Sequence, residues 1–230
     1  MTTHLVTGAG SGIGAVLADR LQGRGDHLVL LARTTARADE LAERYPGSQV
    51  VVADLADASA LERISGLPEE IDSLHHVAGV VELGCVAEQG SEVLSHHLAV
   101  NLVAPAILTR RCLPALRRTR GTVVFVNSSA GLSANADWSA YAASKFGLRG
   151  FADALRAEEV EHGVRVTTIF PSRTATPMQE KVHEQEGRTY DASRWIAPST
   201  VVDTILHVLD LPDDASIPEV TVRPVLPRAT

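Results

Sequence analysis

The segment VNSSAGLSANADWSAYAASK, residues 126–145, contains residue types and a spacing suited to proton chemistry. Tyr141 and Lys145 are four residues apart, so on a helix they share one face. A free tyrosine has a pKa of about 10 and is a poor base at neutral pH. A nearby ammonium favours the phenolate, so we expect Lys145 to lower the pKa of Tyr141 and make it a general acid/base.

The serines upstream of this pair offer a hydroxyl that would bond a substrate oxygen as its charge changes. On spacing alone, Ser128 and Ser129 both fit. The alternative is structural, because an isolated Tyr-x-x-x-Lys is common on helices and a serine at a strand end often satisfies only a backbone group. A second site on the same chain is needed to favour the catalytic interpretation.

A nucleotide site is indicated by TGAGSGIG, residues 7–14, between a predicted strand and a predicted helix. Gly8 permits a tight turn, Gly12 lets a pyrophosphate approach the backbone, and Gly14 lets the helix pack on the strand. The start of the helix then offers free N–H groups to the anion. The alternative is a glycine-rich turn without a ligand.

The end of the second predicted strand favours NADP(H) over NAD(H). An NAD site normally has Asp or Glu there to bond the ribose hydroxyls, whereas this chain has Ala32 and Arg33. A guanidinium pairs with a 2′-phosphate that a carboxylate would repel. A solvated Arg33, in a site that accepts either cofactor, is the alternative.

Short apolar runs alternate with longer amphipathic ones, which predicts an α/β fold with a doubly wound parallel sheet. Several runs are apolar on both faces, as a sheet covered by helices on both sides requires. The predicted strands are 4–7, 27–32, 49–53, 74–78, 122–127, 164–170 and 219–223. The predicted helices are 13–24, 36–45, 57–65, 92–117, 139–162 and 198–210.

One polar segment, residues 172–197, interrupts this alternation and shows little periodicity. Long irregular insertions are often lids or binding loops, although a plain surface connection fits the pattern equally well. Trp138, Met178, Tyr190 and Trp195 either line an apolar substrate pocket or cover the edge of the core.

Composition argues against several classes of protein. The net charge of −7 gives no sign of a nucleic-acid or anionic-membrane surface. The longest apolar region, 98–108, is too short and too interrupted to span a bilayer. Two cysteines and no signal-peptide pattern predict a cytoplasmic protein. No metal site is expected, because H-E-x-x-H and C-x-x-C are absent and the adjacent histidines 75–76 would point to opposite faces of a strand.

Taken together, the motifs resemble those of the classical short-chain dehydrogenase/reductase family over nearly the whole chain. The family's TGxxxGxG is TGAGSGIG here, and its acidic residue after the third strand matches Asp54. Its helix asparagine matches Asn101, and its active-site serine, tyrosine and lysine match Ser128, Tyr141 and Lys145.

Two motifs depart from the family pattern. HVAG has Val77 where the family has Asn, and PSRTAT has Ser172 where the family has Gly. Val77 lacks a side chain that braces the central sheet. Ser172 lacks the conformational freedom of glycine in the loop that contacts the nicotinamide.

The resemblance implies a single Rossmann-type domain with a seven-stranded parallel sheet. Its nucleotide-binding half would be about 1–90 and its catalytic half about 91–230, with a substrate loop at about 172–197. The implied activity is hydride transfer between NAD(P)(H), with NADP(H) preferred, and a small carbonyl or alcohol substrate. The implied catalytic residues are Ser128, Tyr141, Lys145 and Asn101. The implied cofactor residues are Gly8, Gly10, Ser11, Gly12, Ile13, Gly14, Arg33, Asp54, Leu55, Ala78, Gly79, Tyr141, Lys145, Pro171, Thr174 and Thr176.

Family members also assemble, which implies a homodimer or homotetramer built on the helices predicted at 92–117 and 139–162. Small residues on the second helix would allow close approach between subunits or pack inside one subunit: Ala143, Gly147, Gly150 and Ala154. The alternative function is a non-catalytic NADP(H)-binding regulatory or scaffold protein of the same fold. The physiological direction of the reaction is not determined by these motifs.

Overall fold

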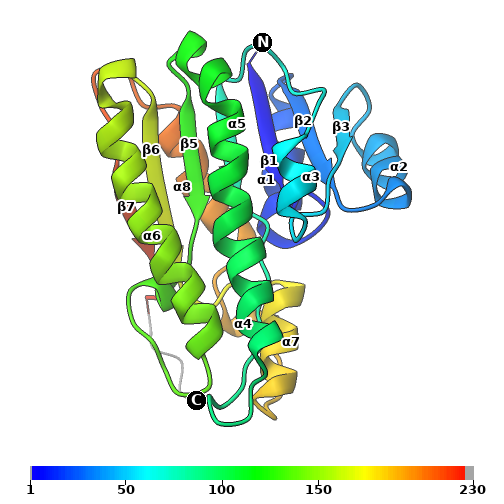
Figure 1. The fold of residues 1–230 in the computed structure, drawn as a ribbon, viewed down its shortest axis with the longest axis vertical. Helices are drawn as coiled ribbons and strands as arrows, with labels where there is room; N and C mark the ends of the chain where they lie inside the picture. Colours follow the sequence, from blue (N-terminus) through cyan, green and yellow to red (C-terminus); the bar gives the residue numbers. More distant parts are fainter. Residues whose placement is uncertain (1, 226–230) are drawn as a thin grey trace.

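The computed structural model describes residues 2–225 and contains a seven-stranded, entirely parallel sheet in the order β3-β2-β1-β4-β5-β6-β7. This confirms the predicted fold class, a single doubly wound α/β domain (Figure 1). The strands are β1 (Thr3–Thr7), β2 (His27–Ala32), β3 (Gln49–Val52), β4 (Ser73–His76), β5 (Thr122–Val126), β6 (Arg165–Pro171) and β7 (Glu219–Val222).

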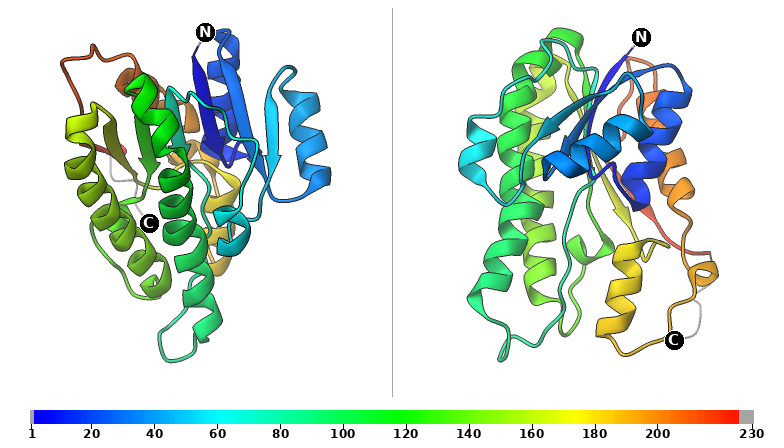
Figure 2. Two further views of the ribbon diagram at one scale, coloured as in Figure 1. Left: turned by 45° about the horizontal axis from the view of Figure 1, so that its top comes forward. Right: turned by 90° about the vertical axis from the view of Figure 1, so that its right-hand side faces the viewer.

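Helices cover both faces of the sheet (Figures 1 and 2). On one face lie α3 (Ala58–Glu62), α5 (Ala104–Thr119) and α6 (Ser139–Glu159). On the other face lie α1 (Gly12–Gly23), α2 (Thr35–Arg44) and α8 (Pro198–Leu209).

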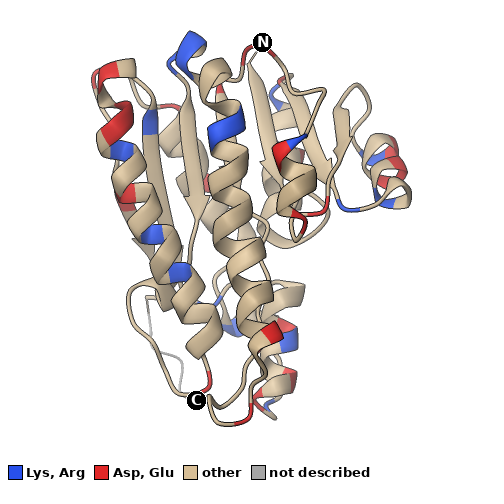
Figure 3. Ribbon diagram, viewed as in Figure 1, with Lys and Arg blue, Asp and Glu red and all other residues tan. Residues whose placement is uncertain are grey.

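Each face has its own apolar core, and successive strand residues contribute to opposite cores. Leu5 packs with the α5 and α6 side, whereas Val6 packs with the α1 and α8 side. Phe125 and Val124 alternate in the same way on β5. Because the strands are buried on both faces, their sequences are continuous apolar runs. Figure 3 shows most charged residues on the helices and loops.

The prediction of one continuous helix at 92–117 is wrong. The chain forms α4 (Ser91–Leu98), then a π-helical turn at Ala99–Val103, and then α5. Apolar periodicity does not reveal such a widened turn, because the residues on either side keep facing the sheet. Single π turns are frequent at functional sites, and this one contains Asn101.

The prediction that residues 172–197 are irregular is also wrong for the first half of that segment. It contains α7 (Pro177–Gln185), followed by a 3₁₀ turn at Ala192–Arg194. Thr176 caps α7 by accepting a hydrogen bond from the Gln179 amide, and Pro177 occupies the first helical position. Because α7 covers a cleft and not the core, its sequence is polar and its helical period is weak.

The strand order reverses between β2 and β4 on either side of β1, so a crevice opens at the carboxyl ends of these strands. Figures 1 and 2 show α7 beyond these carboxyl ends, at the same end of the molecule as the start of α4. The fold therefore brings the segments 7–14, 126–145 and 171–197 to one end of the molecule.

Candidate active site

Two cavities meet at the carboxyl ends of β1 and β4. The larger, of about 600 Å³, is here called the main cleft, and the smaller, of about 540 Å³, the side cavity. The main cleft is lined by these residues implied by the resemblance: Gly8, Ser11, Gly12, Ile13, Gly14, Ala78, Gly79, Ser128, Tyr141, Lys145, Pro171, Thr174 and Thr176. The side cavity is lined by Gly8, Gly10, Ser11, Arg33, Asp54, Leu55, Ala78 and Gly79.

The glycine turn is shaped by close backbone contacts. Gly8 has φ +77, and a Cβ there would lie 2.9 Å from the amide nitrogen of Ala78. A Cβ on Gly14 would lie 2.2 Å from the carbonyl oxygen of Gly8. Side chains at these positions would collide with the backbone, so glycine is what lets the turn pack this closely against the chain after β4 and the start of α1. The turn therefore forms a cradle that fits the pyrophosphate of a dinucleotide.

The side cavity carries two arginines. Arg33 is exposed at the end of β2, and within residues 2–225 its guanidinium has no ion-pair partner. Arg37 lies one helical turn later and donates to the Gly10 carbonyl oxygen at 2.7 Å and to Glu40. Only Arg33 was expected here. The available signal for Arg37 was a second arginine four residues after Arg33, in the first turn of the helix that follows β2.

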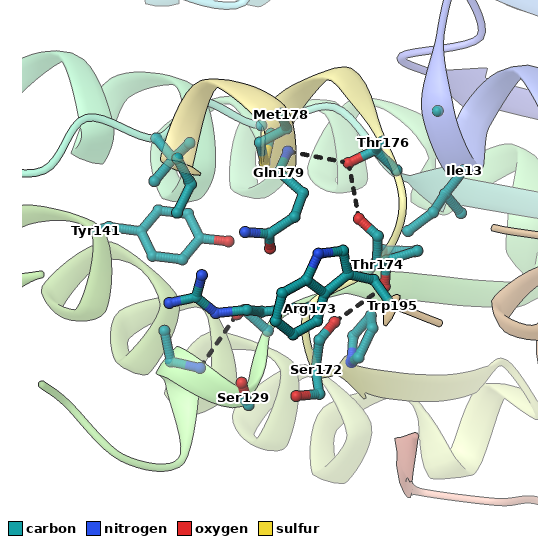
Figure 4. Close-up of a pocket in the computed structure, with 18 of the residues that line it drawn as sticks. Ile13, Ser129, Tyr141, Ser172, Arg173, Thr174, Thr176, Met178, Gln179 and Trp195 are labelled. Carbon is teal, nitrogen blue, oxygen red and sulfur yellow. Dashed lines mark hydrogen bonds between the residues drawn. The ribbon is translucent and has the colours of Figure 1, made fainter. Parts of the chain in front are cut away.

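Tyr141 lies in the first turn of α6, with its hydroxyl pointing into the main cleft (Figure 4). The rings of Trp138 and His97 pack edge-on against it at 5.8 and 6.2 Å between centroids. Ser128, and not Ser129, has its side chain close enough to the tyrosine hydroxyl to lower the pKa of Tyr141. The Ser128 hydroxyl also accepts a hydrogen bond from the Ala130 amide at 3.1 Å, which holds it at the end of β5.

The expectation that Lys145 lowers the pKa of Tyr141 is wrong for the protein without its cofactor. Burial raises the pKa of Tyr141, and the nearby Ser128 side chain offsets this only in part. Burial also lowers the pKa of Lys145 from 10.5 to about 8. Both shifts have the same cause, because a buried site disfavours whichever form of a group is charged.

Lys145 is 4% exposed, and its ammonium lies 5.7 Å from the centre of the Tyr141 ring. It donates to the carbonyl oxygen of Val126 at 3.2 Å. Asn127, next along β5, donates to the Lys145 carbonyl oxygen at 3.0 Å, so the strand end and the helix are tied together. These bonds hold the tyrosine and lysine at a constant spacing in the cleft.

Asn101 lies behind the wall of the main cleft, 1% exposed. Its side-chain oxygen accepts from the Val80 amide at 2.9 Å, and its amide group donates to the Val80 carbonyl oxygen and to Ser144, each at 3.0 Å. Ser144 in turn donates to the Tyr141 carbonyl oxygen at 2.7 Å. Asn101 therefore links the loop after β4 to the helix that carries Tyr141 and Lys145.

The two departures from the family motifs are accommodated. Ser172 does not adopt a left-handed conformation, and its amide donates to the Val222 carbonyl oxygen at 2.9 Å, so glycine is not required there. Val77 packs against the apolar core on the α1 and α8 side. Its amide and the Ala78 amide both donate to the Thr7 hydroxyl, at 3.0 and 3.1 Å.

The outer wall of the main cleft comes from the loop after β6, α7 and the segment after it (Figure 4). Three of the four residues proposed for a substrate pocket line the cleft, namely Trp138, Met178 and Trp195. Tyr190 packs on His183 instead, with 5.3 Å between ring centroids.

Arg173, which the motifs did not single out, holds this wall in place. Its guanidinium donates to both Glu186 carboxylate oxygens at 2.8 and 2.5 Å. It also lies over the rings of Trp138 and Trp195, at 5.8 and 5.5 Å from their centroids. Its position within PSRTAT was the available signal.

The histidines form no metal site within residues 2–225. His75 and His76 are buried in β4 and have different partners: Ser73 at 2.5 Å and Thr109 at 2.9 Å, respectively. His97 is buried and joins the Glu82 amide to the Val93 carbonyl oxygen. These bonds give the three buried histidines structural partners within the fold.

Comparisons with known proteins agree with this architecture. The family model described as "short chain dehydrogenase" matches residues 2–187. An uncharacterized short-chain type dehydrogenase/reductase y4eK from Sinorhizobium fredii is 32% identical over 226 residues, covering 96% of this chain and 90% of that protein.

Two solved structures have the same fold. A putative short chain dehydrogenase from Escherichia coli CFT073, complexed with NADPH, has a TM-score of 0.85 and 28% identity, covering 97% of each chain. The closed form of serine dehydrogenase complexed with NADP⁺ has a TM-score of 0.86 and 24% identity, covering 97% of this chain and 95% of that one, which is a likeness of fold. From the match over residues 2–187 and the relative that aligns along most of its length, the chain belongs to the short-chain dehydrogenase/reductase family of oxidoreductases.

Proposed function

We propose that the protein is an NADP(H)-preferring oxidoreductase that interconverts a carbonyl compound and its alcohol. The observation that carries this proposal is one cleft that brings the glycine turn together with Ser128, Tyr141 and Lys145. When bound, the nicotinamide supplies the hydride for reduction or accepts it in oxidation.

The cofactor would lie along both cavities. Gly8, Gly10, Ser11, Gly12, Ile13 and Gly14 would hold the pyrophosphate, and Asp54 and Leu55 the adenine side. Ala78, Gly79, Pro171, Thr174 and Thr176 would contact the nicotinamide half, with Lys145 on its ribose. The 2′-phosphate would pair with Arg33, whose guanidinium has no ion-pair partner within residues 2–225, whereas Arg37 is already paired with Glu40.

The protein's own residues handle the proton. In reduction, the Tyr141 hydroxyl gives its proton to the substrate oxygen while the Ser128 hydroxyl donates a hydrogen bond to that oxygen. Lys145, whose pKa is lowered to about 8, would restore the proton to Tyr141. Asn101 holds the loop after β4 against the helix that carries both residues. In oxidation the proton moves in the opposite direction.

The experiment that tests this proposal is Tyr141→Phe, with Tyr190→Phe as the matched control outside the cleft lining. With NADPH and a panel of carbonyl compounds, we expect kcat for Tyr141→Phe to fall at least about 100-fold, as for loss of a general acid. The Kd for NADPH, read from its fluorescence, should stay within a few-fold of wild type. Equal activity of Tyr141→Phe and wild type would refute the mechanism. Tight NADPH binding by wild type with no turnover on the panel would favour the regulatory or scaffold alternative.

The cofactor preference has its own test, Arg33→Asp. Replacing the guanidinium by a carboxylate should lower kcat/KM for NADPH and raise it for NADH, because the charge facing the 2′ position is reversed. Arg20→Asp, on the outer surface of α1, is the control for a general charge effect. A wild-type kcat/KM for NADH above that for NADPH would overturn the preference.

We further propose a cytoplasmic homodimer or homotetramer. Cys85 is exposed and Cys112 buried, and both are free thiols, as a reducing compartment favours. No helix within residues 2–225 has the length and apolar character needed to cross a membrane. On α6, Ala143, Gly150 and Ala154 face outward and leave room for a second helix.

A further inference from the structure

The wall of the main cleft is positively charged, although the chain as a whole has a net charge of −7. Among the described residues, the cleft lining contains four strongly basic side chains and no aspartate or glutamate: Lys145, Arg173, Arg188 and Arg194. Lys145 lies next to Tyr141, at the reacting end of the cleft. The three arginines belong to the outer wall, where a substrate would extend away from the tyrosine.

Arg173 is not the group that would bind an anion, because Glu186 already neutralises its charge. Glu186 accepts one hydrogen bond from each terminal nitrogen of Arg173 and balances its charge, and the guanidinium lies over the indoles of Trp138 and Trp195. Figure 4 shows Arg173 and Trp195 together along this wall of the pocket. Arg173 therefore acts as a positioning residue for the segment that carries the other two arginines.

Arg188 follows α7 directly, and its amide donates to the His183 carbonyl oxygen at 2.9 Å, which fixes its backbone. Within residues 2–225, its guanidinium forms no ion pair. The nearby carboxylate that feels its charge, Glu186, is bonded to Arg173. Arg194, from the 3₁₀ turn, lines the same cleft. A guanidinium presents paired N–H donors that match the two oxygens of a carboxylate.

The same lining also offers apolar side chains, with Val81, Met178 and Val182 among them, beside the polar Gln179 and His183. We infer that the substrate is an oxo acid, or the hydroxy acid formed from it, with an apolar stem between the reacting carbon and a carboxylate. The carbonyl oxygen lies at Tyr141 and Ser128, and the carboxylate pairs with Arg188. This inference rests on the proposed oxidoreductase function and names the substrate class of that site.

The test compares matched pairs of ketones, 4-oxopentanoate and 5-oxohexanoate against their methyl esters, with NADPH as reductant. For wild type we expect kcat/KM to be at least about tenfold higher for the acid, the size of effect of one charge-assisted pair. In Arg188→Gln the ratio of acid to ester should fall about tenfold. Lys181→Gln removes a charge from the exposed side of α7 and is the control that should leave the ratio unchanged.

The outcomes separate this inference from the proposed function. Turnover of esters equal to or faster than that of acids by wild type would overturn the inference and leave the oxidoreductase intact. A rise in the Kd for NADPH in Arg188→Gln, with the acid-to-ester ratio unchanged, would also overturn it, because the arginine would then serve a cofactor phosphate. No turnover of neutral or anionic carbonyls would refute the proposed function itself.

Discussion

Burial governs the two ionisable side chains at the reacting end of the main cleft. Tyr141 and Lys145 are 6% and 4% exposed, and each has its pKa moved in favour of its neutral form. In the protein without cofactor, the tyrosine is thus a proton donor at neutral pH and not a phenolate. A bound positive charge, such as an oxidised nicotinamide, is the remaining means of favouring the phenolate.

The raised pKa of Tyr141 predicts different pH profiles for the two directions of the reaction. Reduction needs the protonated hydroxyl, so kcat/KM for a carbonyl should be level from pH 6 to 8 and fall only in the alkaline range. Oxidation needs the phenolate, so kcat/KM for the alcohol should rise with pH across the range from 7 to 10. Initial rates in both directions at constant ionic strength measure this. An oxidation rate that is level from pH 7 upward would show that the pKa of Tyr141 does not stay raised once the oxidised cofactor is bound.

The lowered pKa of Lys145 predicts that the charged lysine decreases the free energy of unfolding at neutral pH. The unfolded chain binds more protons than the folded one between pH 8 and 10.5, so the stability associated with this group rises with pH through that window. The shift from 10.5 to about 8 corresponds to an upper limit of about 3 kcal/mol below pH 8.

Lys145→Met should therefore stabilise the protein without cofactor at pH 7. The expected net gain is about 1–2 kcal/mol, because losing the hydrogen bond to the Val126 carbonyl oxygen offsets part of the benefit of removing the buried charge. The gain should shrink at pH 9.5, and activity should be lost. Urea unfolding at the two pH values, at one protein concentration, measures the difference. A gain of equal size at both pH values would contradict the lowered pKa.

At the scale of elements, α7 and the chain after it are held by a few polar contacts at the edge of the fold. Arg173 pairs with Glu186 at the end of α7, and the Gln185 side chain accepts from the Leu83 amide at 2.9 Å. Thr174 forms a bridge with Ile196, where the segment returns to the core. This segment therefore opens more readily than the sheet, as the wall of a substrate cleft requires.

Loss of the Arg173–Glu186 ion pair should loosen this segment without unfolding the domain. In Glu186→Gln, we expect trypsin to cleave after Arg188 and Arg194 several-fold faster than in wild type, because local opening exposes both sites. Glu184→Gln, on the exposed side of α7, is the matched control. Mass spectrometry of timed digests identifies the cleavage sites, and the thermal midpoint reports the whole domain. Equal cleavage rates in both variants would show that the ion pair does not hold the segment.

At the scale of the whole molecule, the helices on the α5 and α6 face keep apolar side chains in contact with solvent. Phe146 is 43% exposed on α6, and Leu94 and Val103 are 42% and 39% exposed on α4 and the π turn. Of the small residues on α6, Gly147 packs inside the chain, since a Cβ there would lie 2.8 Å from Leu102. An exposed apolar face of this kind is typical of a subunit interface.

The proposed assembly predicts that light scattering gives a mass of two or four times 24.5 kDa. Gly150→Arg adds bulk and charge to the outward side of α6 and should shift the protein towards monomers at micromolar concentration. Val86→Arg, on an exposed loop away from α6, should not. A wild-type mass of 24.5 kDa at every concentration would refute the assembly.

The sequence by itself determined the order of strands and helices, because burial on both faces leaves apolar runs and surface helices leave a 3.6-residue period. It also placed the glycine turn, since the TGxxxGxG spacing lies within one strand–turn–helix unit and the contacts of Gly14 are local to that unit. Ordered motif spacing singled out Tyr141, Lys145 and Ser128, and all three lie in the lining of the main cleft.

The tertiary structure alone decided what depends on contacts between distant segments. The sign of the Tyr141 shift follows from how deeply α4, α6 and the loop after β4 bury the ring, which no spacing along the chain encodes. The π turn at Asn101 depends on its bonds to Val80 and Ser144, 21 and 43 residues away. The cleft has a positive wall because the fold brings Arg173, Arg188 and Arg194 into the same cleft as Tyr141, at the carboxyl ends of the strands. The polar sequence of residues 172–197 predicts neither the helix α7 nor the position of these arginines in the cleft.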